Sequence, residues 1–196
     1  MSQPKLILAS ASPRRLDLLS QVGVVPDMVL PADIDEQEHP GELPRHYVKR
    51  ITLGKIKASL EKPETKDAYV IAADTMVACG RRILPKTEDE EAARMCLDLI
   101  SARRHRVYGG LALAHPDGKI AYRCVETVVK FKRLSHDEIN MYIKSGEWHG
   151  KAGGYAIQGL ASQFVTFLQG SYSNVVGLSL YDIMQMIKGS GYVVKR

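Results

Sequence analysis

The chain has 196 residues, of which 45% are hydrophobic and 25% are charged, a composition that can bury a sizeable core. No apolar run approaches the roughly 20 residues that a bilayer-spanning helix needs, which excludes the membrane-spanning classes, and we expect neither export nor a membrane partner. The formal net charge of +5 suits acidic ligands such as phosphates, although surplus lysine on a solvated surface gives the same value.

The cysteines and the absence of linkers indicate the compartment and the number of domains. Cys79, Cys96 and Cys124 are odd in number and lack the close pairing of metal knuckles or redox motifs. A reducing compartment fits them best, so we expect a cytoplasmic protein. No repeat, low-complexity tract or long linker divides the sequence, which favours one domain over residues 1–196.

The N-terminal part of the sequence predicts one strand and two helices. Residues 5–9 are typical of a short buried strand, after which Ser12 can cap a helix over residues 13–21 that begins with proline. Apolar side chains at helical spacing then predict a second helix over residues 47–60.

A second strand carries the first candidate for chemistry. The small and apolar run at residues 68–73 predicts a central strand, which places Asp74 and Thr75 at its carboxyl end. A carboxylate in this position suits a metal ligand or a base that activates water. An aspartate that ends a strand is more often a turn or cap residue, and its position alone does not separate these interpretations.

Two pairs with capping-box spacing predict the starts of two further helices. Thr87 precedes Glu90 by three residues, and Ser135 precedes Glu138 by three residues. An apolar pattern with helical spacing follows each pair, as expected for the first turns of buried helices.

A long hairpin lies between these two helices. Residues 106–114 and 120–131 are typical of strands, and the Pro-Asp-Gly sequence at residues 116–118 predicts the turn that connects them. Strands and helices therefore mix along the chain, and the sequence predicts the α/β class.

The junction after the first strand holds side chains that suit a phosphate. Ser10, Ser12, Arg14 and Arg15 combine hydroxyl groups, guanidinium groups and the free amides of a helix N-terminus. Neighbouring helical positions point in different directions, so we expect at most one of the two arginines to face the ligand squarely. A capped helix with two solvated arginines explains the same spacing.

Further candidates are scattered along the chain. Glu36, Lys55 and Lys86 are each suited to phosphate or metal, although a single such side chain is usually only solvated. Small residues at 151–159 let the backbone approach a ligand, and Gln158 offers an amide that can bind a base edge. A glycine-rich turn before a strand explains this segment equally well. The sequence contains no P-loop, no GxSxG elbow and no HExxH spacing.

Four separated blocks, read together, resemble the Maf family of nucleoside triphosphate pyrophosphatases. They are LILASASPRR near the start, AADTMV in the middle, and KAGGYAIQG followed by GSYSNVVGL near the end. Their order and spacing cover nearly the whole chain and are far more specific than any single motif. The resemblance implies an α/β fold related to the inosine triphosphate pyrophosphatases, in which a mixed elongated sheet with flanking helices forms two lobes around a central cleft. It also implies a divalent metal cofactor, Mg²⁺ or Mn²⁺, and a homodimer.

The same resemblance assigns roles to residues of this chain. Asp74 would be the proton acceptor and, together with Glu36, would hold the metal. The residues around the triphosphate would be Ser10, Ser12, Arg15, Lys55 and Lys86.

Three positions that separate branches of the family indicate the nucleotide. Arg14, Thr75 and Gln158 resemble the branch that acts on dTTP and UTP, whereas the branch that prefers 7-methyl-GTP has tryptophan, glutamine and glutamate there. A glutamine amide can donate to one edge atom of a pyrimidine and accept from another, which suits thymine or uracil. Modified pyrimidine nucleotides are further expected substrates.

Two positions depart from the family pattern. Lys86 is preceded by Pro85 and followed by Thr87, where the family usually has lysine followed by proline, which leaves the geometry of this loop open. Gly109 stands where threonine is common, which removes a hydroxyl group near the expected cleft.

We therefore expect an enzyme that hydrolyses dTTP and UTP to the nucleoside monophosphate and pyrophosphate and so cleanses the nucleotide pool. The alternative is a nucleotide-binding regulator of septum formation and cell division without significant turnover, since the family is linked by name to that process. No nucleic-acid partner is expected, because helix-turn-helix, RRM and zinc signatures are absent and the only dense basic run is Arg103, Arg104 and Arg106.

Overall fold

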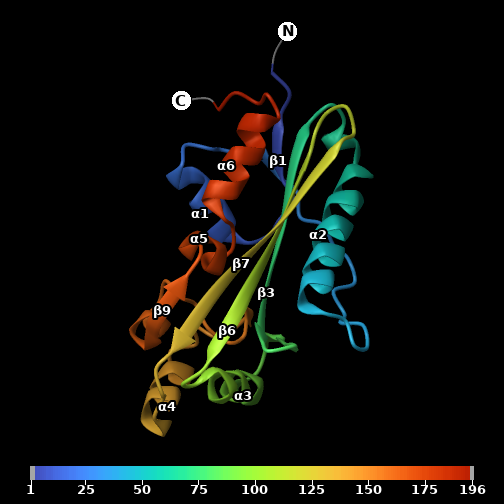
Figure 1. The fold of residues 1–196 in the computed structure, drawn as a ribbon. Coiled ribbons are helices and arrows are strands. Elements are labelled where there is room, and N and C mark those ends of the chain that lie inside the picture. Colours follow the sequence, from blue (N-terminus) through green and yellow to red (C-terminus); the bar gives the residue numbers. More distant parts are fainter. Residues whose placement is uncertain (1–2, 195–196) are drawn as a thin grey trace.

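The computed structural model describes residues 3–194, which form one long mixed sheet with helices on both of its faces (Figure 1). The predicted domain range of residues 1–196 includes positions 1, 2, 195 and 196, which lie outside the described residues. The seven-stranded sheet has the order β2-β1-β3-β6-β7-β9, with β4 paired to β3. Its strands are β1 (Leu6–Leu8), β2 (Met28–Val29), β3 (Tyr69–Cys79), β4 (Arg82–Leu84), β6 (Arg104–Ala114), β7 (Ile120–Phe131) and β9 (Val165–Gln169). A separate two-stranded ribbon pairs β5 (Lys86–Thr87) with β8 (Lys151–Ala152).

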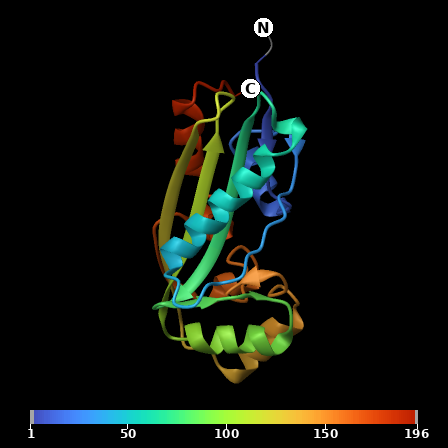
Figure 2. The ribbon, with the colours of Figure 1, turned by 90° about the vertical axis from the view of Figure 1, so that its right-hand side faces the viewer.

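The helices pack along the sheet and at one of its ends. They are α1 (Pro13–Gln21), α2 (Pro44–Leu60), α3 (Glu90–Ile100), α4 (His136–Lys144), α5 (Tyr172–Val176) and α6 (Leu180–Gly189), with short 3₁₀ helices at Pro63–Thr65 and Leu160–Phe164. The helix α2 lies along one face of the long strands, and α1 and α6 lie on the other (Figures 1 and 2). Within residues 3–194, no helix combines the length and the apolar character that a bilayer crossing requires.

The strand directions make the sheet mixed. β1 runs parallel to both β2 and β3, whereas the pairs β3–β4, β3–β6, β6–β7 and β7–β9 are antiparallel. Parallel neighbours require a crossover connection, which α1 and α2 provide, and the antiparallel hairpin β6–β7 needs only a short turn. The predicted hairpin and the predicted α/β class are confirmed.

Two apolar clusters lie toward opposite ends of the long strands and form two lobes (Figure 1). One cluster packs α3 and α4 against the sheet and includes Leu97, Phe131 and Phe164. The other packs α1 and α6 against the sheet and includes Leu19 and Ile187. Each of these helices buries apolar side chains, and removal of that surface from water favours both lobes.

The predicted end of the central strand is wrong. β3 continues past Asp74 to Cys79 and pairs with β6 along most of its length. Aspartate is depleted in strands, which is why the sequence pattern ended the strand there. Buried Met76 and Val77 continue the strand, so Asp74 lies in its middle, opposite Gly110 of β6.

The predicted capping box of Thr87 with Glu90 is also wrong. Asp89 caps α3, and its carboxylate accepts a hydrogen bond of 2.8 Å from the backbone N–H of Ala92. Thr87 is instead fully buried in β5, where its hydroxyl donates to the carbonyl oxygen of Trp148 at 2.7 Å. Threonine and aspartate both serve as N-caps, so spacing alone could not separate two candidates this close together.

The other predicted caps are present at the expected positions. Ser135 caps α4 and exchanges hydrogen bonds with Glu138 in both directions, which confirms the second capping box. Ser12 occupies the N-cap position of α1, but its side chain makes no capping hydrogen bond. The amides in the first turn of α1 therefore receive no hydrogen bond from the Ser12 hydroxyl.

The close approach of α2 to the sheet depends on a residue without a side chain. At Gly110, an added Cβ atom would lie 2.0 Å from Oγ1 of Thr52 and 3.0 Å from the backbone oxygen of Val48, both in α2. The Thr52 hydroxyl is itself fixed, because it donates to that same backbone oxygen at 2.7 Å. Gly110 thus lets α2 approach closely enough for Lys55 to reach Asp74 in the middle of β3.

We expect Gly110→Ala to destabilise the protein by about 2 kcal/mol, because the new methyl group must push the α2 backbone away from β6. Urea denaturation followed by circular dichroism measures this change. Gly189→Ala is the matched control, since an added Cβ atom at the end of α6 would meet nothing within 4 Å. Equal free energies of unfolding for the two variants would contradict a close approach of α2 to β6 at Gly110.

A buried histidine in the lobe around α3 and α4 links stability to pH. His105 is 1% exposed, and its Nε2 atom lies 2.8 Å from the hydroxyl oxygen of Tyr155. Burial lowers the pKa of His105 from 6.5 to about 4. Because the folded pKa lies below the unfolded one, the stabilising contribution is complete above pH 6.5 and is lost as the pH falls toward about 4.

From this group alone, we expect the free energy of unfolding to fall by about 3 kcal/mol between neutral pH and about pH 4. His105→Gln keeps a hydrogen-bonding group for Tyr155 but cannot titrate. The free energy of unfolding of this variant should therefore fall less as the pH is lowered. Urea denaturation of both proteins across this pH range measures the difference. Parallel curves would show that protonation of His105 does not oppose folding.

Candidate active site

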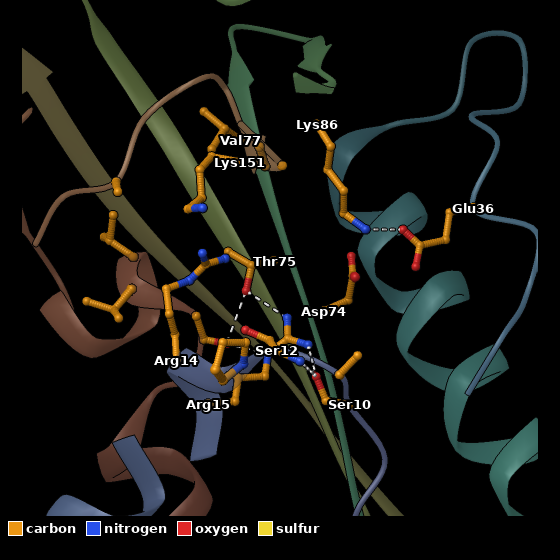
Figure 3. A pocket seen from close by; sticks show the side chains of 18 of the residues that line it. Ser10, Ser12, Arg14, Arg15, Glu36, Asp74, Thr75, Val77, Lys86 and Lys151 are labelled. Atoms are coloured by element: carbon orange, nitrogen blue, oxygen red, sulfur yellow. Dashed lines mark hydrogen bonds and ion pairs between the residues drawn. The ribbon is translucent and has the colours of Figure 1, made fainter. Parts of the chain in front are cut away.

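All the predicted site residues line one pocket (Figure 3). The pocket has a volume of about 400 Å³ and lies among the loop after β1, the start of α1, the middle of β3 and the β5–β8 ribbon. The predicted residues in its lining are Ser10, Ser12, Arg14, Arg15, Glu36, Lys55, Asp74, Thr75, Lys86 and Gln158. The structure therefore brings together side chains from distant parts of the sequence.

Arg15 is fixed beneath the pocket by neutral oxygen atoms. Its guanidinium donates to Oγ of Ser10 at 2.8 Å, to Oγ1 of Thr75 at 3.3 Å and to the carbonyl oxygen of Gly177 at 2.9 Å. Burial lowers the pKa of Arg15, while the charges of nearby carboxylates, Asp74 first among them, oppose this shift. Arginine stays charged at neutral pH, so Arg15 supplies a fixed positive charge near Asp74.

Both arginines line the pocket, and the expectation that at most one faces the ligand squarely stays a prediction. Arg15 is buried and Arg14 is half-buried. Residues 9–15 line the pocket without interruption, which means that it lies at the end of α1 rather than along one side of this helix. Successive side chains of a first turn can surround such an end, whereas the prediction assumed a ligand on one helical face.

An ion-paired cluster occupies the middle of the sheet. Nζ of Lys55, from α2, lies 2.6 Å from Oδ1 of Asp74 and 2.7 Å from Oε1 of Glu36. The other oxygen of Glu36 accepts a hydrogen bond from Lys86 (Figure 3). Asp74 is 3% exposed and Lys55 is 8% exposed, so water screens their attraction only weakly.

Glu36 joins this cluster from the long loop between β2 and α2. Burial raises the pKa of its carboxyl group, but hydrogen bonds from Lys55 and Lys86 outweigh burial and leave the pKa below its usual value. The carboxylate form is therefore favoured, and two ion pairs hold the loop against the pocket.

The β5–β8 ribbon determines how Lys86 reaches the pocket in spite of the unusual residues around it. The carbonyl oxygen of Pro85 accepts a hydrogen bond from the N–H of Gly153 at 3.0 Å. On the other side of Lys86, the hydroxyl of Thr87 donates to the carbonyl oxygen of Trp148 at 2.7 Å. Both neighbours of Lys86 are thus tied to residues that flank β8.

Gly109, the second unusual position, is not among the described residues that line the pocket. An added Cβ atom there would lie 1.9 Å from Oδ1 of Asn174. The amide nitrogen of Asn174 donates to the backbone oxygen of Val107 at 3.2 Å and to Oγ1 of Thr127 at 3.1 Å. The Asn174 side chain fills the space beside Gly109, and the expected loss of a hydroxyl group near the cleft stays a prediction.

Gln158 reaches the pocket from the glycine-rich segment after β8. Gly153 and Gly154 have φ angles of +70° and +69°, which glycine adopts without strain, and an added Cβ atom at Gly153 would lie 2.9 Å from Val77. The segment can therefore pack closely against β3. Gln158 itself is exposed, so its amide is accessible to a ligand.

Sequence reasoning assigned no role to Lys151 and Gly177, although both line the pocket. Lys151 is the single lysine of the KAGGYAIQG block, and its place in that block could have indicated a position in the pocket. Gly177 acts through its carbonyl oxygen, which accepts hydrogen bonds from Arg15 and Thr75. A backbone acceptor of this kind leaves no mark in a side-chain pattern.

Asp74 and Glu36 form a donor set that fits a divalent cation. Across residues 3–194, no group of three or more His, Cys, Asp and Glu side chains could hold a metal ion. Mg²⁺, however, is commonly held by one or two carboxylates together with substrate phosphates and water. Two carboxylates that both contact the nitrogen of Lys55 are close enough to share one cation, so these residues fit such a site.

Comparison with known proteins gives strong similarity over nearly the whole chain. The family model described as Maf-like protein matches residues 5–190. A dTTP/UTP pyrophosphatase of Paramagnetospirillum magneticum is 58% identical over 187 residues, covering 95% of this chain and 97% of that protein. A dTTP/UTP pyrophosphatase of Maricaulis maris is 57% identical over 194 residues, covering 99% of this chain and 92% of that protein.

Among solved structures, a nucleoside-triphosphatase or dITP/XTP pyrophosphatase of Mycobacterium abscessus matches with a TM-score of 0.43 and 16% identity, over 66% of this chain and 74% of that chain. That similarity is too weak to carry an argument. The family model and the two relatives confirm the resemblance found in the four sequence blocks. The chain belongs to the Maf-like protein family.

Proposed function

We propose that this protein hydrolyses dTTP and UTP, and modified pyrimidine nucleotides, to the nucleoside monophosphate and pyrophosphate, and so cleanses the nucleotide pool. The relatives named dTTP/UTP pyrophosphatase support this choice of substrates. The observation that carries the chemistry is the buried carboxylate of Asp74, which lines a pocket rich in cations. A volume of about 400 Å³ also lies in the range of small-molecule sites.

In this reaction Asp74 is the proton acceptor. A water molecule attacks the α-phosphorus, and the Asp74 carboxylate orients that water and takes its proton. Lys55 holds the carboxylate in place through its ion pair of 2.6 Å. Arg15 and Lys86 neutralise negative charge that develops on the departing pyrophosphate.

The loop after β1 binds phosphate oxygens. Ser10 and Ser12 bring hydroxyl groups to the pocket at the N-terminus of α1. The free amides and the dipole of a helix N-terminus favour an anion at this end. The triphosphate therefore meets hydroxyl and amide donors as well as the charged side chains.

Glu36 and Asp74 would hold a divalent metal ion, Mg²⁺ or Mn²⁺. When bound, such an ion neutralises charge on phosphate oxygens and makes the α-phosphorus a better target for water. Lys55 and Lys86, which contact these carboxylates in the structure, would also donate to phosphate oxygens through their remaining N–H groups.

Arg14, Thr75 and Gln158 select the base. Gln158 is exposed to the pocket, and its amide can donate to one edge atom of uracil or thymine and accept from another. Thr75 lies beside Arg15 through a hydrogen bond of 3.3 Å, so its hydroxyl has a fixed position.

The enzyme is favoured over the alternative, a nucleotide-binding regulator without turnover, by the names of the relatives. The single domain, the homodimer and the absence of a nucleic-acid partner stay predictions from the sequence. The cytoplasmic location also stays a prediction, which the free thiols of Cys79, Cys96 and Cys124 support.

We expect Asp74→Asn to lower kcat for dTTP and UTP by at least about a hundredfold, because an amide cannot accept the proton of the attacking water. Pyrophosphate release from dTTP, UTP, CTP and 7-methyl-GTP with Mg²⁺ or Mn²⁺ measures this change. Asp98→Asn, at an exposed position of α3, is the matched control and should keep full activity.

Turnover retained by Asp74→Asn would remove Asp74 from the role of proton acceptor. If the unchanged protein released no pyrophosphate from any of these nucleotides, the regulator would be favoured instead. Urea denaturation of Asp74→Asn determines whether a loss of activity reflects unfolding.

We expect EDTA to abolish turnover and added Mg²⁺ or Mn²⁺ to restore it. Glu36→Gln removes one carboxylate ligand, so the Mg²⁺ concentration for half-maximal activity should rise by about tenfold. Glu61→Gln, exposed at the end of α2, is the control for the charge change. An unchanged Mg²⁺ requirement in Glu36→Gln would mean that other groups hold the metal.

A further inference from the structure

The cations that line the pocket differ in how their charges are balanced. Two lysines are paired with pocket carboxylates, and Arg15 donates to three neutral oxygen atoms. The guanidinium group of Arg14 makes no hydrogen bond and no ion pair with the described part of the chain. The amino group of Lys151 makes one hydrogen bond, to the carbonyl oxygen of His149 at 3.0 Å, and two of its three N–H groups remain for a ligand.

The carboxylates near this pair of cations have other partners. Glu88, which also lines the pocket, lies 3.4 Å from Nε2 of His149, and Glu147 accepts a hydrogen bond of 2.8 Å from the N–H of Leu160. Burial lowers the pKa of Lys151, and the charge of Arg14 lowers it further, while Glu147 opposes this shift. Arg14 and Lys151 thus bring two positive charges together without an intervening carboxylate.

Backbone pairing and a buried hydrogen bond fix the position from which the Lys151 side chain extends. Lys151 is opposite Thr87 in the β5–β8 ribbon, and the buried Thr87 hydroxyl is bonded to the carbonyl oxygen of Trp148. Figure 3 shows the side chains of Lys151 and Arg14 on the same side of the pocket, away from Lys86 and its partner carboxylate. The pocket therefore has two ends of different chemistry.

The end with Lys151 has the surface that a base requires. Small and branched apolar side chains from β8, from the segment after it and from α5 line it, together with the amide of Gln158: Ala152, Ala156, Val175 and Val176. A flat aromatic base can pack on such a surface, whereas the apolar side chains offer a phosphate no hydrogen bond. Since the proposed function puts the phosphates at Asp74 and its neighbouring lysines, the base lies beside Arg14 and Lys151.

We propose that Lys151, together with Arg14, selects the nucleotide by the carbonyl oxygens of its base. Both side chains are donors and have no acceptor. Uracil and thymine present an oxygen at position 4 that accepts from a cation, whereas cytosine presents an amino group that would oppose one donor with another. A positively charged base, such as 7-methylguanine, is disfavoured by repulsion. The inference rests on the proposed function and adds Lys151 as a specificity-determining residue.

Lys151→Met tests the proposal, because methionine has a similar length but neither charge nor donor. The measurement is kcat/KM for UTP and CTP, whose bases differ in the group at position 4. We expect the ratio of UTP to CTP to fall by about tenfold, the scale of one lost hydrogen bond to a charged group. Activity with 7-methyl-GTP should rise relative to UTP. Lys144→Met, exposed in α4, is the matched control and should leave the ratio unchanged.

An equal loss of kcat/KM for UTP and CTP would overturn the proposal, since Lys151 would then be a phosphate contact. Calorimetric Kd values of UMP and CMP give the same ratio without turnover, so a failure of hydrolysis counts against the proposed function alone. Should Lys151→Met not fold, Lys151→Gln replaces it, because its amide can also accept from the cytosine amino group. An unchanged ratio in Lys151→Gln would equally overturn the proposal.

Discussion

A buried ion pair in the middle of a long strand is the constraint on which the rest of the structure depends. The carboxylate of Asp74, 3% exposed, lies 2.6 Å from the ammonium group of Lys55, 8% exposed. Taking these charges out of water costs several kcal/mol for each ion, and only close and well-placed partners offset that cost. Glu36 completes the arrangement, because its carboxylate contacts the same nitrogen at 2.7 Å. The surrounding fold must therefore hold β3, α2 and the loop between β2 and α2 in fixed positions relative to one another.

The fold meets this requirement through backbone pairing and one missing side chain. Asp74 stays within the hydrogen-bonded ladder of β3 and β6, so its backbone is satisfied while its side chain serves the pocket. Opposite it, Gly110 leaves room for the backbone and Thr52 of α2, which brings Lys55 over the strand. The two apolar clusters pack against these strands toward their opposite ends. Packing energy of the lobes thus supports a polar site that is costly by itself.

Much of this was predictable from the sequence, and the failures have physical reasons. Local signals such as the Pro-Asp-Gly turn and the Ser135 cap predict elements correctly because the interactions that form them lie within a few residues. The same local view ended β3 at Asp74, because the pairing with β6 and the ion pair with Lys55 that allow a buried aspartate in this strand involve residues that are distant in sequence. It also missed the Gly177 carbonyl that fixes Arg15, since that contact joins residues that are far apart in sequence. The chemistry of side chains can be read from a sequence. Backbone carbonyl acceptors, and contacts between residues that are distant in the sequence, cannot.

The pairing of charges makes the two ends of the pocket chemically different. Five cations and three carboxylates line it, and the carboxylates of Asp74 and Glu36 lie at one end with two of the lysines. At the other end, Arg14 and Lys151 have no carboxylate partner and stand among apolar side chains. A nucleotide bound in reverse would bring its base onto the ion pairs, and these would lose water without gaining hydrogen bonds. It would also place the triphosphate against an apolar wall and away from the carboxylates that fit a metal. The unequal pairing of charges therefore favours one orientation, in which the α-phosphorus comes to Asp74.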